Sequence, residues 1–268
     1  MTAKRSNLPF RTLVQSTALL ALHTNFAQWV GAMWVCNPVM SCHACPLAWF
    51  ACPIGILSHL TFWGLFPLLT LGMLIVLGVL IGRLLCGWIC PFGFLQDLLY
   101  RIPSKKGRLP RWADWIKYPL LLLTVFLLPG LFGVDYSFCT LCPTSFLQVT
   151  APSFFTDQEF TVDPAFYLKA GVTLAVLLLA VRYSRFFCRV LCPIGALLAL
   201  FNFLCFWRVK PPTESCISCG RCNRACPTDC RPAKRFLQEI PANRNMECVA
   251  CHDCRPVCPV PDRPGKED

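Results

Sequence analysis

Charged residues are scarce in this chain, and acidic ones are the scarcest of them. Only 15% of its 268 residues are charged, with 14 Asp and Glu against 25 Lys and Arg, whereas 55% are hydrophobic and the mean hydropathy is positive. This composition lies outside the range of ordinary soluble domains and favours a small integral membrane protein. The net charge of +11 does not point to nucleic acid as a partner, because the cations stand beside the ends of apolar segments instead of alternating with aromatics.

Several common cofactor motifs are also missing. The sequence contains no Gly-x-Gly-x-x-Gly and no P-loop, so dinucleotide binding and nucleotide hydrolysis have no support. Its one Cys-x-x-Cys-His, at 248–252, lies inside a ferredoxin run. A small-residue cleavage site is absent behind the basic start MTAKRSNLPFR, which predicts a retained first membrane helix. Cysteine, by contrast, occurs 20 times in a chain too long and too apolar for a secreted disulfide scaffold, and this favours metal ligation.

Four apolar segments are long enough to cross a hydrocarbon core of about 30 Å, which takes about 20 helical residues. They are expected at 11–35, 56–82, 115–134 and 165–187. Lys and Arg concentrate after the second segment and at the end of the fourth, whereas the loop around TDQEFTVD is acidic, so the positive-inside rule places both termini in the cytoplasm. The expected location is the bacterial or archaeal cytoplasmic membrane, with a multi-pass topology.

The cysteines reveal an internal repeat. An outer pair, Cys42 and Cys45, recurs 97 residues later, and an inner pair, Cys86 and Cys90, recurs 102 residues later. The second copies are Cys139 and Cys142 on the outer face, and Cys188 and Cys192 on the inner face. We therefore predict a mainly α fold, in which a four-helix transmembrane bundle of two internal repeats over 1–210 precedes a cytoplasmic ferredoxin-like domain over 211–268.

The last domain carries the most specific motifs. CISCGRCNRACP and CVACHDCRPVCP both follow the bacterial C-x-x-C-x-x-C-x-x-x-C-P spacing, in which three cysteines hold one [4Fe-4S] cluster and the fourth serves the other. The first cluster would be held by Cys216, Cys219, Cys222 and Cys258, and the second by Cys248, Cys251, Cys254 and Cys226. The alternative is two structural zinc sites, but zinc ligands normally come in pairs and not as three cysteines plus one. Cys230 is left without a role.

The four inner cysteines have the right number and symmetry for one more [4Fe-4S] cluster, and buried packing thiols are the alternative. The four outer cysteines are likewise a candidate ligand set for a fourth [4Fe-4S] cluster. Cys36 or Cys52 would be able to replace one of these ligands. Disulfides are the alternative there, because the outer side is oxidising. His23 and His59 fall within the first two predicted crossings, where they would ligate a haem, contact a quinone or serve as packing histidines.

The predicted crossings, the inner motifs CGWICPFG and CRVLCPIG and the terminal ferredoxin runs together resemble the NapH/MauN-type membrane-bound polyferredoxins, a family of 4Fe-4S quinol dehydrogenase membrane components. The resemblance covers essentially the whole chain. It implies electron exchange between the quinone pool, or a cytoplasmic donor, and a redox partner across the membrane. The outer motifs SCHACPLAWFACP and CTLCP depart from the plainest members of that family.

We therefore expect an electron-transfer subunit of an oxidoreductase complex that connects cytoplasmic and extracytoplasmic redox partners. The expected partners are membrane lipid, other subunits, an extracytoplasmic cytochrome or reductase, and quinone. Two alternatives stay open: a quinol dehydrogenase without an outer cluster, and a maturation factor that reduces a metal site in a partner enzyme. Because the two faces lie up to about 30 Å apart, a quinone, a haem or a partner subunit would fill the gap between inner and outer sites.

Overall fold

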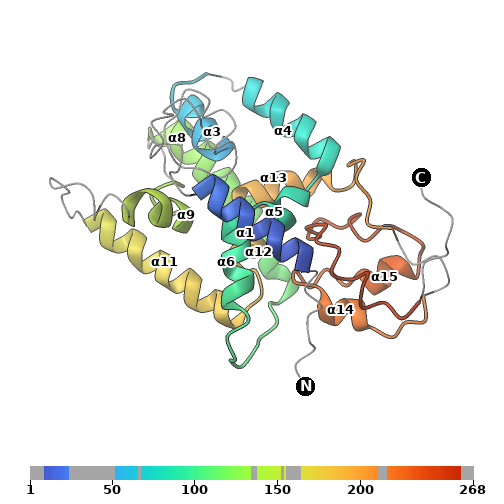
Figure 1. The fold of residues 1–268 in the computed structure, drawn as a ribbon. Coiled ribbons are helices and arrows are strands. Elements are labelled where there is room, and N and C mark those ends of the chain that lie inside the picture. Colours follow the sequence, from blue (N-terminus) through green and yellow to red (C-terminus); the bar gives the residue numbers. More distant parts are fainter. Residues whose placement is uncertain are drawn as a thin grey trace.

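The computed structural model describes most of the chain outside the termini and the first outer loop. The described residues are 9–23, 52–65, 68–133, 138–151, 154, 164–210 and 216–260. Within these ranges every regular element is helical (Figure 1). The mainly α fold that the sequence predicts is therefore confirmed for the part of the chain that can be described.

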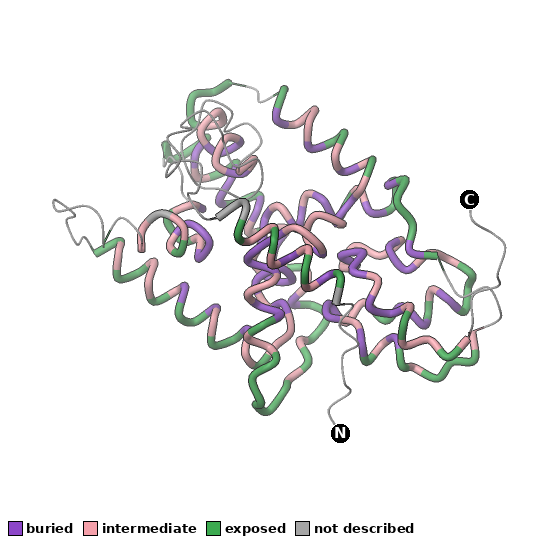
Figure 2. The backbone as a smooth tube through the Cα atoms, viewed as in Figure 1, coloured by how far each residue is buried: buried purple, intermediate pink, exposed green. Residues whose placement is uncertain are grey.

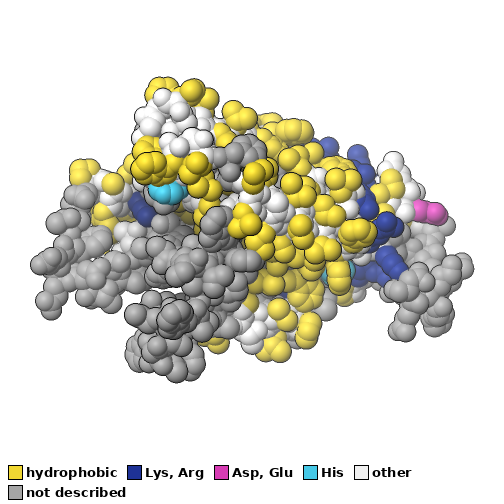
Figure 3. All heavy atoms as spheres, turned by 90° about the horizontal axis from the view of Figure 1, so that it is seen from above, with side chains coloured by type: hydrophobic (Ala, Val, Ile, Leu, Met, Phe, Trp, Pro, Cys, Tyr) yellow, Lys and Arg dark blue, Asp and Glu magenta, His cyan; other side chains and the backbone are white. Residues whose placement is uncertain are grey.

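Two helices are long and apolar enough to cross a membrane. One spans Arg111–Phe132 and the other is α11, Pro164–Arg182. The first is built from a 3-10 turn η1 (Arg111–Trp115), α7 (Lys117–Leu121), a π segment η2 (Leu122–Leu127) and α8 (Leu128–Phe132). Both helices expose long runs of leucine, and Figures 2 and 3 show how little of α11 is buried and how broadly apolar side chains cover one face. Such surfaces suit contact with lipid.

The second predicted crossing is not one continuous helix. The chain forms α3 (Pro53–Phe62), turns through Trp63 and Gly64, and resumes as α4 (Leu68–Ile81). Gly64 adopts a left-handed conformation with φ of 66°, which ends α3, and the sequence places a proline directly before α4. The prediction of a single helix over 56–82 is therefore wrong, and a bundle of four crossings stays a prediction.

The first predicted crossing is described only as α1, Pro9–His23, and the remainder of 11–35 lies outside the described residues. This helix packs against α5 (Leu84–Trp88) and α6 (Pro91–Leu99). Its Arg11 and Gln15 are buried, and both side chains donate hydrogen bonds to the carbonyl of Gly87. The start of α1 is thus fixed by polar contacts to the inner cysteine motif.

The inner half of the repeat is confirmed by matching elements. The pair α5 and α6 recurs 102 residues later as α12 (Phe186–Val190) and α13 (Pro193–Phe201), with the same lengths in each copy. The apolar helices α4 and α11 precede the two copies. These four short helices meet at the centre of the molecule, where buried residues concentrate (Figures 1 and 2).

The C-terminal segment is made of loops and two short helices, α14 (Arg221–Ala225) and α15 (Pro232–Phe236). It has a small core of its own, which includes Val209 and Phe236 together with predicted ligand cysteines. Ser218, Ala250 and His252 take left-handed conformations between successive cysteines. The segment lies on one side of the central helices, away from the N-terminal end of α11 (Figure 1). The domain boundary at residue 211 stays a prediction, because 211–215 lie outside the described residues.

The packing of Gly87 generates the first testable prediction. A Cβ at this position would lie 2.2 Å from the carbonyl oxygen of Val249, so Gly87→Ala forces the C-terminal segment away and should cost about 1–3 kcal/mol of stability. Thermal unfolding in detergent, with proteolytic release of the C-terminal segment, measures the effect. Gly72→Ala is the matched control, because a Cβ there meets nothing within 4 Å. Equal resistance of the two variants would contradict the close packing.

Candidate metal centres

The inner cysteine pairs are positioned by helix caps. Cys90 and Cys192 each precede a proline that begins a helix, and their sulfurs accept hydrogen bonds from the amides of Gly93 at 3.4 Å and Gly195 at 3.3 Å. A Cβ on either glycine would approach a carbonyl oxygen, of Cys86 or Cys188 respectively, to 3.2 Å. The sequence Cys-Pro-x-Gly therefore builds a tight turn that directs the thiol back over the first cysteine of the pair.

All four inner cysteines converge on one buried position. Burial raises the pKa of Cys192 well above its usual value, and the negative charges of Cys188, Cys86 and Cys90 contribute to the same shift. All four are thiols rather than disulfides. Four convergent thiols, three of them buried, are the donor set that a [4Fe-4S] cluster takes as thiolates, so the residues present fit this group.

Two fully buried arginines link the repeats at this position. Arg83 donates to the carbonyl of Cys188 at 3.4 Å, and Arg185 donates to the carbonyl of Cys86 at 3.0 Å. Each arginine stands three residues before the first cysteine of its own repeat and serves the cysteine of the other repeat. They bring two positive charges to a site of four thiolates, which reduces the cost of burying the negative charge. The shared R-x-x-C spacing, Arg83 to Cys86 and Arg185 to Cys188, is the sequence signal for both arginines.

One side chain also donates directly to an inner sulfur. The Nε2 of Gln96 lies 3.2 Å from the Sγ of Cys188, while its Oε1 accepts from the amide of Phe187. Gln96 is fully buried. The sequence gives no signal for this contact, because Gln96 has no counterpart in the second repeat.

Both predicted C-terminal ligand sets come together. Burial raises the pKa of Cys222 to about 11, with the charges of Cys216, Cys219 and Cys258 as further causes. Burial also raises the pKa of Cys254, and the further causes are the charges of Cys251, Cys248, Cys226 and Cys222. Each predicted set therefore groups in space as the motif spacing requires, and Cys222 and Cys254 bring the two sets next to each other.

Cys230 lies within the second set. Its sulfur is 3.3 Å from that of Cys226, and a hydrogen bond from it lowers the pKa of Cys226 to about 6. It also interacts with Cys248. Cys230 is therefore an additional thiol beside the second predicted ligand set. The C-P-x-x-C spacing after the first ferredoxin run is the sequence signal for it.

Within the described residues, no three His, Cys, Asp or Glu side chains are close enough to hold a single metal ion. A four-iron cluster is several atoms wide, so its ligands stand further apart than those of one ion. The grouping of the cysteines fits such a cluster by donor type, number and burial.

The second C-terminal set rests directly on the inner site. Trp88 donates from Nε1 to the carbonyl of Ala250 at 3.0 Å, and Asn202 donates to the carbonyl of Cys248 at 2.8 Å. His252 accepts from the Nε1 of Trp207 at 3.1 Å and packs edge-on against Trp88. The cysteine motif of the helical part and the second ferredoxin run therefore share a contact surface.

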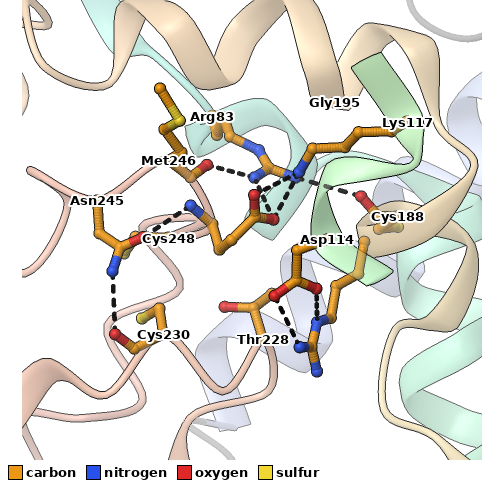
Figure 4. A network of polar contacts seen from close by, with 12 residues as sticks. Arg83, Asp114, Lys117, Cys188, Gly195, Thr228, Cys230, Asn245, Met246 and Cys248 are labelled. Carbon is orange, nitrogen blue, oxygen red and sulfur yellow. Dashed lines mark hydrogen bonds and ion pairs between the residues drawn. The ribbon is translucent and has the colours of Figure 1, made fainter. Parts of the chain in front are cut away.

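Buried ion pairs hold this surface together. Glu247 accepts from Lys117 at 2.5 Å and lies 3.3 Å from Arg83, and both cations are fully buried. Figure 4 shows the side chains of Arg83 and Lys117 converging. Arg11 pairs with Asp253, and Asp97 accepts from both Arg11 and Arg185, at 2.6 Å and 2.7 Å. Most of these pairs join the C-terminal segment to the helices around the inner cysteines.

The outer site is described only in part. Cys42, Cys45 and Cys36 lie outside the described residues, whereas Cys139 and Cys142 precede α9, Pro143–Ser145. Burial raises the pKa of Cys52, and the charge of Cys142 adds to this shift, so these two thiols are neighbours. Cys52 precedes α3 through Cys-Pro-Ile-Gly, the same four residues that follow Leu191 at the inner site. This shared motif is the sequence signal that places Cys52, with Cys142, among the candidate ligands of the outer site.

The two candidate histidines are not brought together by any described contact. His59 packs edge-on against Trp63, with ring centroids 6.3 Å apart. His23 ends α1, and its side chain lies outside the described residues. A haem or quinone site at His23 and His59 therefore stays a prediction.

Comparison with known proteins supports the iron-sulfur interpretation of the helical part. Residues 63–110 and 167–211 both match a family described as a 4Fe-4S binding domain. These two stretches contain the inner pairs of cysteines. The repeat at the centre of the fold therefore coincides with two copies of a known iron-sulfur unit, although the number and place of the clusters stay predictions.

Among curated proteins, the uncharacterized protein MJ0750 of Methanocaldococcus jannaschii is 30% identical over 181 residues, which cover 62% of this chain and 68% of MJ0750. The chain belongs to the family of MJ0750. The putative electron transport protein YccM of Escherichia coli is 31% identical over 64% of this chain, and the regulatory protein NosR of Pseudomonas aeruginosa is 31% identical over 53%. The aligned part spans only 48% of YccM and 19% of NosR. No solved structure matches the chain.

Removal of the Glu247 charge tests the buried ion pairs. Glu247→Gln leaves Arg83 and Lys117 buried without their carboxylate, and the expected loss of stability is about 3 kcal/mol. Thermal unfolding of the full chain in detergent measures it. Glu239→Gln, on an exposed turn, is the control and should change stability by less than about 0.5 kcal/mol. A similar small change for both variants would show that Glu247 does not hold the interface.

Proposed function

We propose that this chain is an integral membrane iron-sulfur protein that transfers electrons between two C-terminal clusters and a third cluster at the inner cysteine site. The contact between residues 248–251 and the Cys86–Cys90 motif carries the proposal. It makes the second C-terminal set and the inner set neighbours across a packed, mostly buried surface. The similarity to YccM, a putative electron transport protein, supports the same interpretation.

The residues of the chain have distinct parts in this function. The cysteines hold the clusters, which supply one-electron transfer when bound. Arg83 and Arg185 provide fixed positive charge beside the inner thiolates, and Gln96 donates to one sulfur. The ion pairs of Glu247 and Asp253 keep the second C-terminal set at a constant distance from the inner site. A fixed distance matters because electron tunnelling falls steeply with separation.

We place both termini and the C-terminal segment on the cytoplasmic side. The positive-inside rule and the many Lys and Arg side chains at that end of the molecule support this orientation (Figure 3). The outer site then faces an extracytoplasmic redox partner, with Cys52 and Cys142 as neighbouring thiols and Cys42, Cys45 and Cys139 as further ligands. Quinone, haem or a partner subunit would carry electrons between the inner and outer faces.

Iron analysis of anaerobically purified full-length protein tests the proposal. Four clusters predict about 16 iron atoms per chain. The double variant Cys90→Ser/Cys192→Ser should lose about 4 of them, while the C-terminal clusters keep their EPR signals. The buried Cys205→Ser variant is the control, because Cys205 belongs to no predicted set and should retain full iron.

An intact protein with only about 8 iron atoms, unchanged in the double variant, would contradict a cluster at the inner site. Loss of all iron in the double variant would instead indicate general misfolding. Circular dichroism and the C-terminal EPR signals separate that outcome from a specific loss.

The hydrogen bond from Gln96 generates a prediction about redox chemistry. A donor to a ligand sulfur stabilises the more negative, reduced cluster, so Gln96→Leu should lower the reduction potential of the inner cluster. An EPR-monitored redox titration measures this shift. Gln238→Leu, on an exposed turn, should leave every potential unchanged. An unchanged inner potential in Gln96→Leu would show that Gln96 does not donate to a cluster ligand.

A further inference from the structure

A cavity of about 390 Å³ opens between the C-terminal segment and the start of the first long helix. Trp115, Tyr118 and Phe203 form its aromatic side. The loop that carries Cys230 and the start of α15 form the opposite side. Asp229 and Arg231, on either side of Cys230, both adopt left-handed conformations, which are costly for residues other than glycine. The shape of this wall is therefore maintained against local backbone strain.

The cavity carries an excess of positive charge. Four cations line it: Arg111, Arg231, Lys234 and Arg235. Among the residues that the structure describes, none of these four side chains forms an ion pair. The lining carboxylates do not balance them, because Asp114 is paired with Arg189 at 2.8 Å and Glu247 is paired with Lys117. Asp229 is the one lining carboxylate left to oppose four cations.

The cavity lies at the level expected for lipid headgroups. Arg111 is the first residue of a helix that is long enough to span a membrane. Trp112 and Trp115 in its first turn are 68% and 63% exposed, and Phe206 beyond Phe203 is 73% exposed. Exposed aromatic side chains beside the end of an apolar helix are typical of the membrane-water interface. The cavity therefore opens among side chains that suit the headgroup layer.

We propose that this cavity binds the phosphate-bearing headgroup of an anionic phospholipid. Basic pockets beside membrane helices on the cytoplasmic side take such headgroups, and the aromatic wall would pack against the glycerol and upper acyl carbons. Arg231, Lys234 and Arg235 belong to the C-terminal segment, whereas Arg111 begins the membrane helix. A bound headgroup would neutralise cations from both parts and fasten the ferredoxin segment to the bilayer surface. The inference rests on the proposed membrane location, but not on electron transfer.

Binding to delipidated full-length protein in detergent tests the proposal. The probes are dihexanoyl phosphatidylglycerol, dihexanoyl phosphatidylcholine and inorganic phosphate, with thermal stabilisation and native mass spectrometry as readouts. Phosphatidylglycerol should bind saturably, and the other two should not at the same concentration. Lys234→Ala/Arg235→Ala should weaken its binding about tenfold or more. Lys105→Ala/Arg108→Ala is the matched control, which removes two exposed cations outside the cavity and should bind as the parent protein does.

Three results would overturn the assignment. They are no response of the parent protein to phosphatidylglycerol, an equal response to inorganic phosphate, and equal weakening in the control variant. Iron content, measured on the same samples, should stay unchanged in both double variants. Failure of lipid binding with full iron content would therefore leave the proposed electron-transfer function standing.

Discussion

The ion pairs that the Glu247 carboxylate forms with two buried cations are the interaction on which the arrangement of the candidate metal centres depends. Glu247 lies between Lys117, from the first long helix, and Arg83, from the turn before the inner cysteines. Burying two cations is costly unless a carboxylate accompanies them, so this pairing strongly favours one docked position of the C-terminal segment. Because Glu247 directly precedes Cys248, the same contact fixes the second ferredoxin run against the helices.

The same short motif positions cysteines at both the inner and the outer site. At Cys52, Cys90, Cys142 and Cys192 a proline follows the cysteine and begins a helix. Proline is favoured at the first helical position because its missing N–H would have had no partner there. The thiol then lies near the free amides of the new helix, which favour negative charge. The sequence thus places four cysteines at helix starts with one short motif, and at Cys90 and Cys192 the sulfur accepts a hydrogen bond from an amide of the new helix.

Sequence reasoning predicted what depends on local spacing. The two ferredoxin sets, the inner repeat and the helix containing residues 115–132 all follow from motif spacing or from runs of apolar residues. Hydropathy alone did not show that Gly64 interrupts the second crossing, although this interruption is local. The other failures lie where long-range packing decides. Counting Lys and Arg for topology hid that Arg83, Lys117 and Arg185 are buried ion-pair partners. Cys52 was recognised only as a substitute, because its partner Cys142 lies 90 residues away.

The crossed arginines make the two repeats depend on each other. Each repeat supplies the cation that contacts the carbonyl of the first inner cysteine in the other repeat. One repeat alone therefore holds only half of the thiols and lacks the guanidinium that contacts its own first cysteine. A change in either arginine acts on the cysteine pair of the opposite repeat, so the two halves of the inner site cannot be assembled independently.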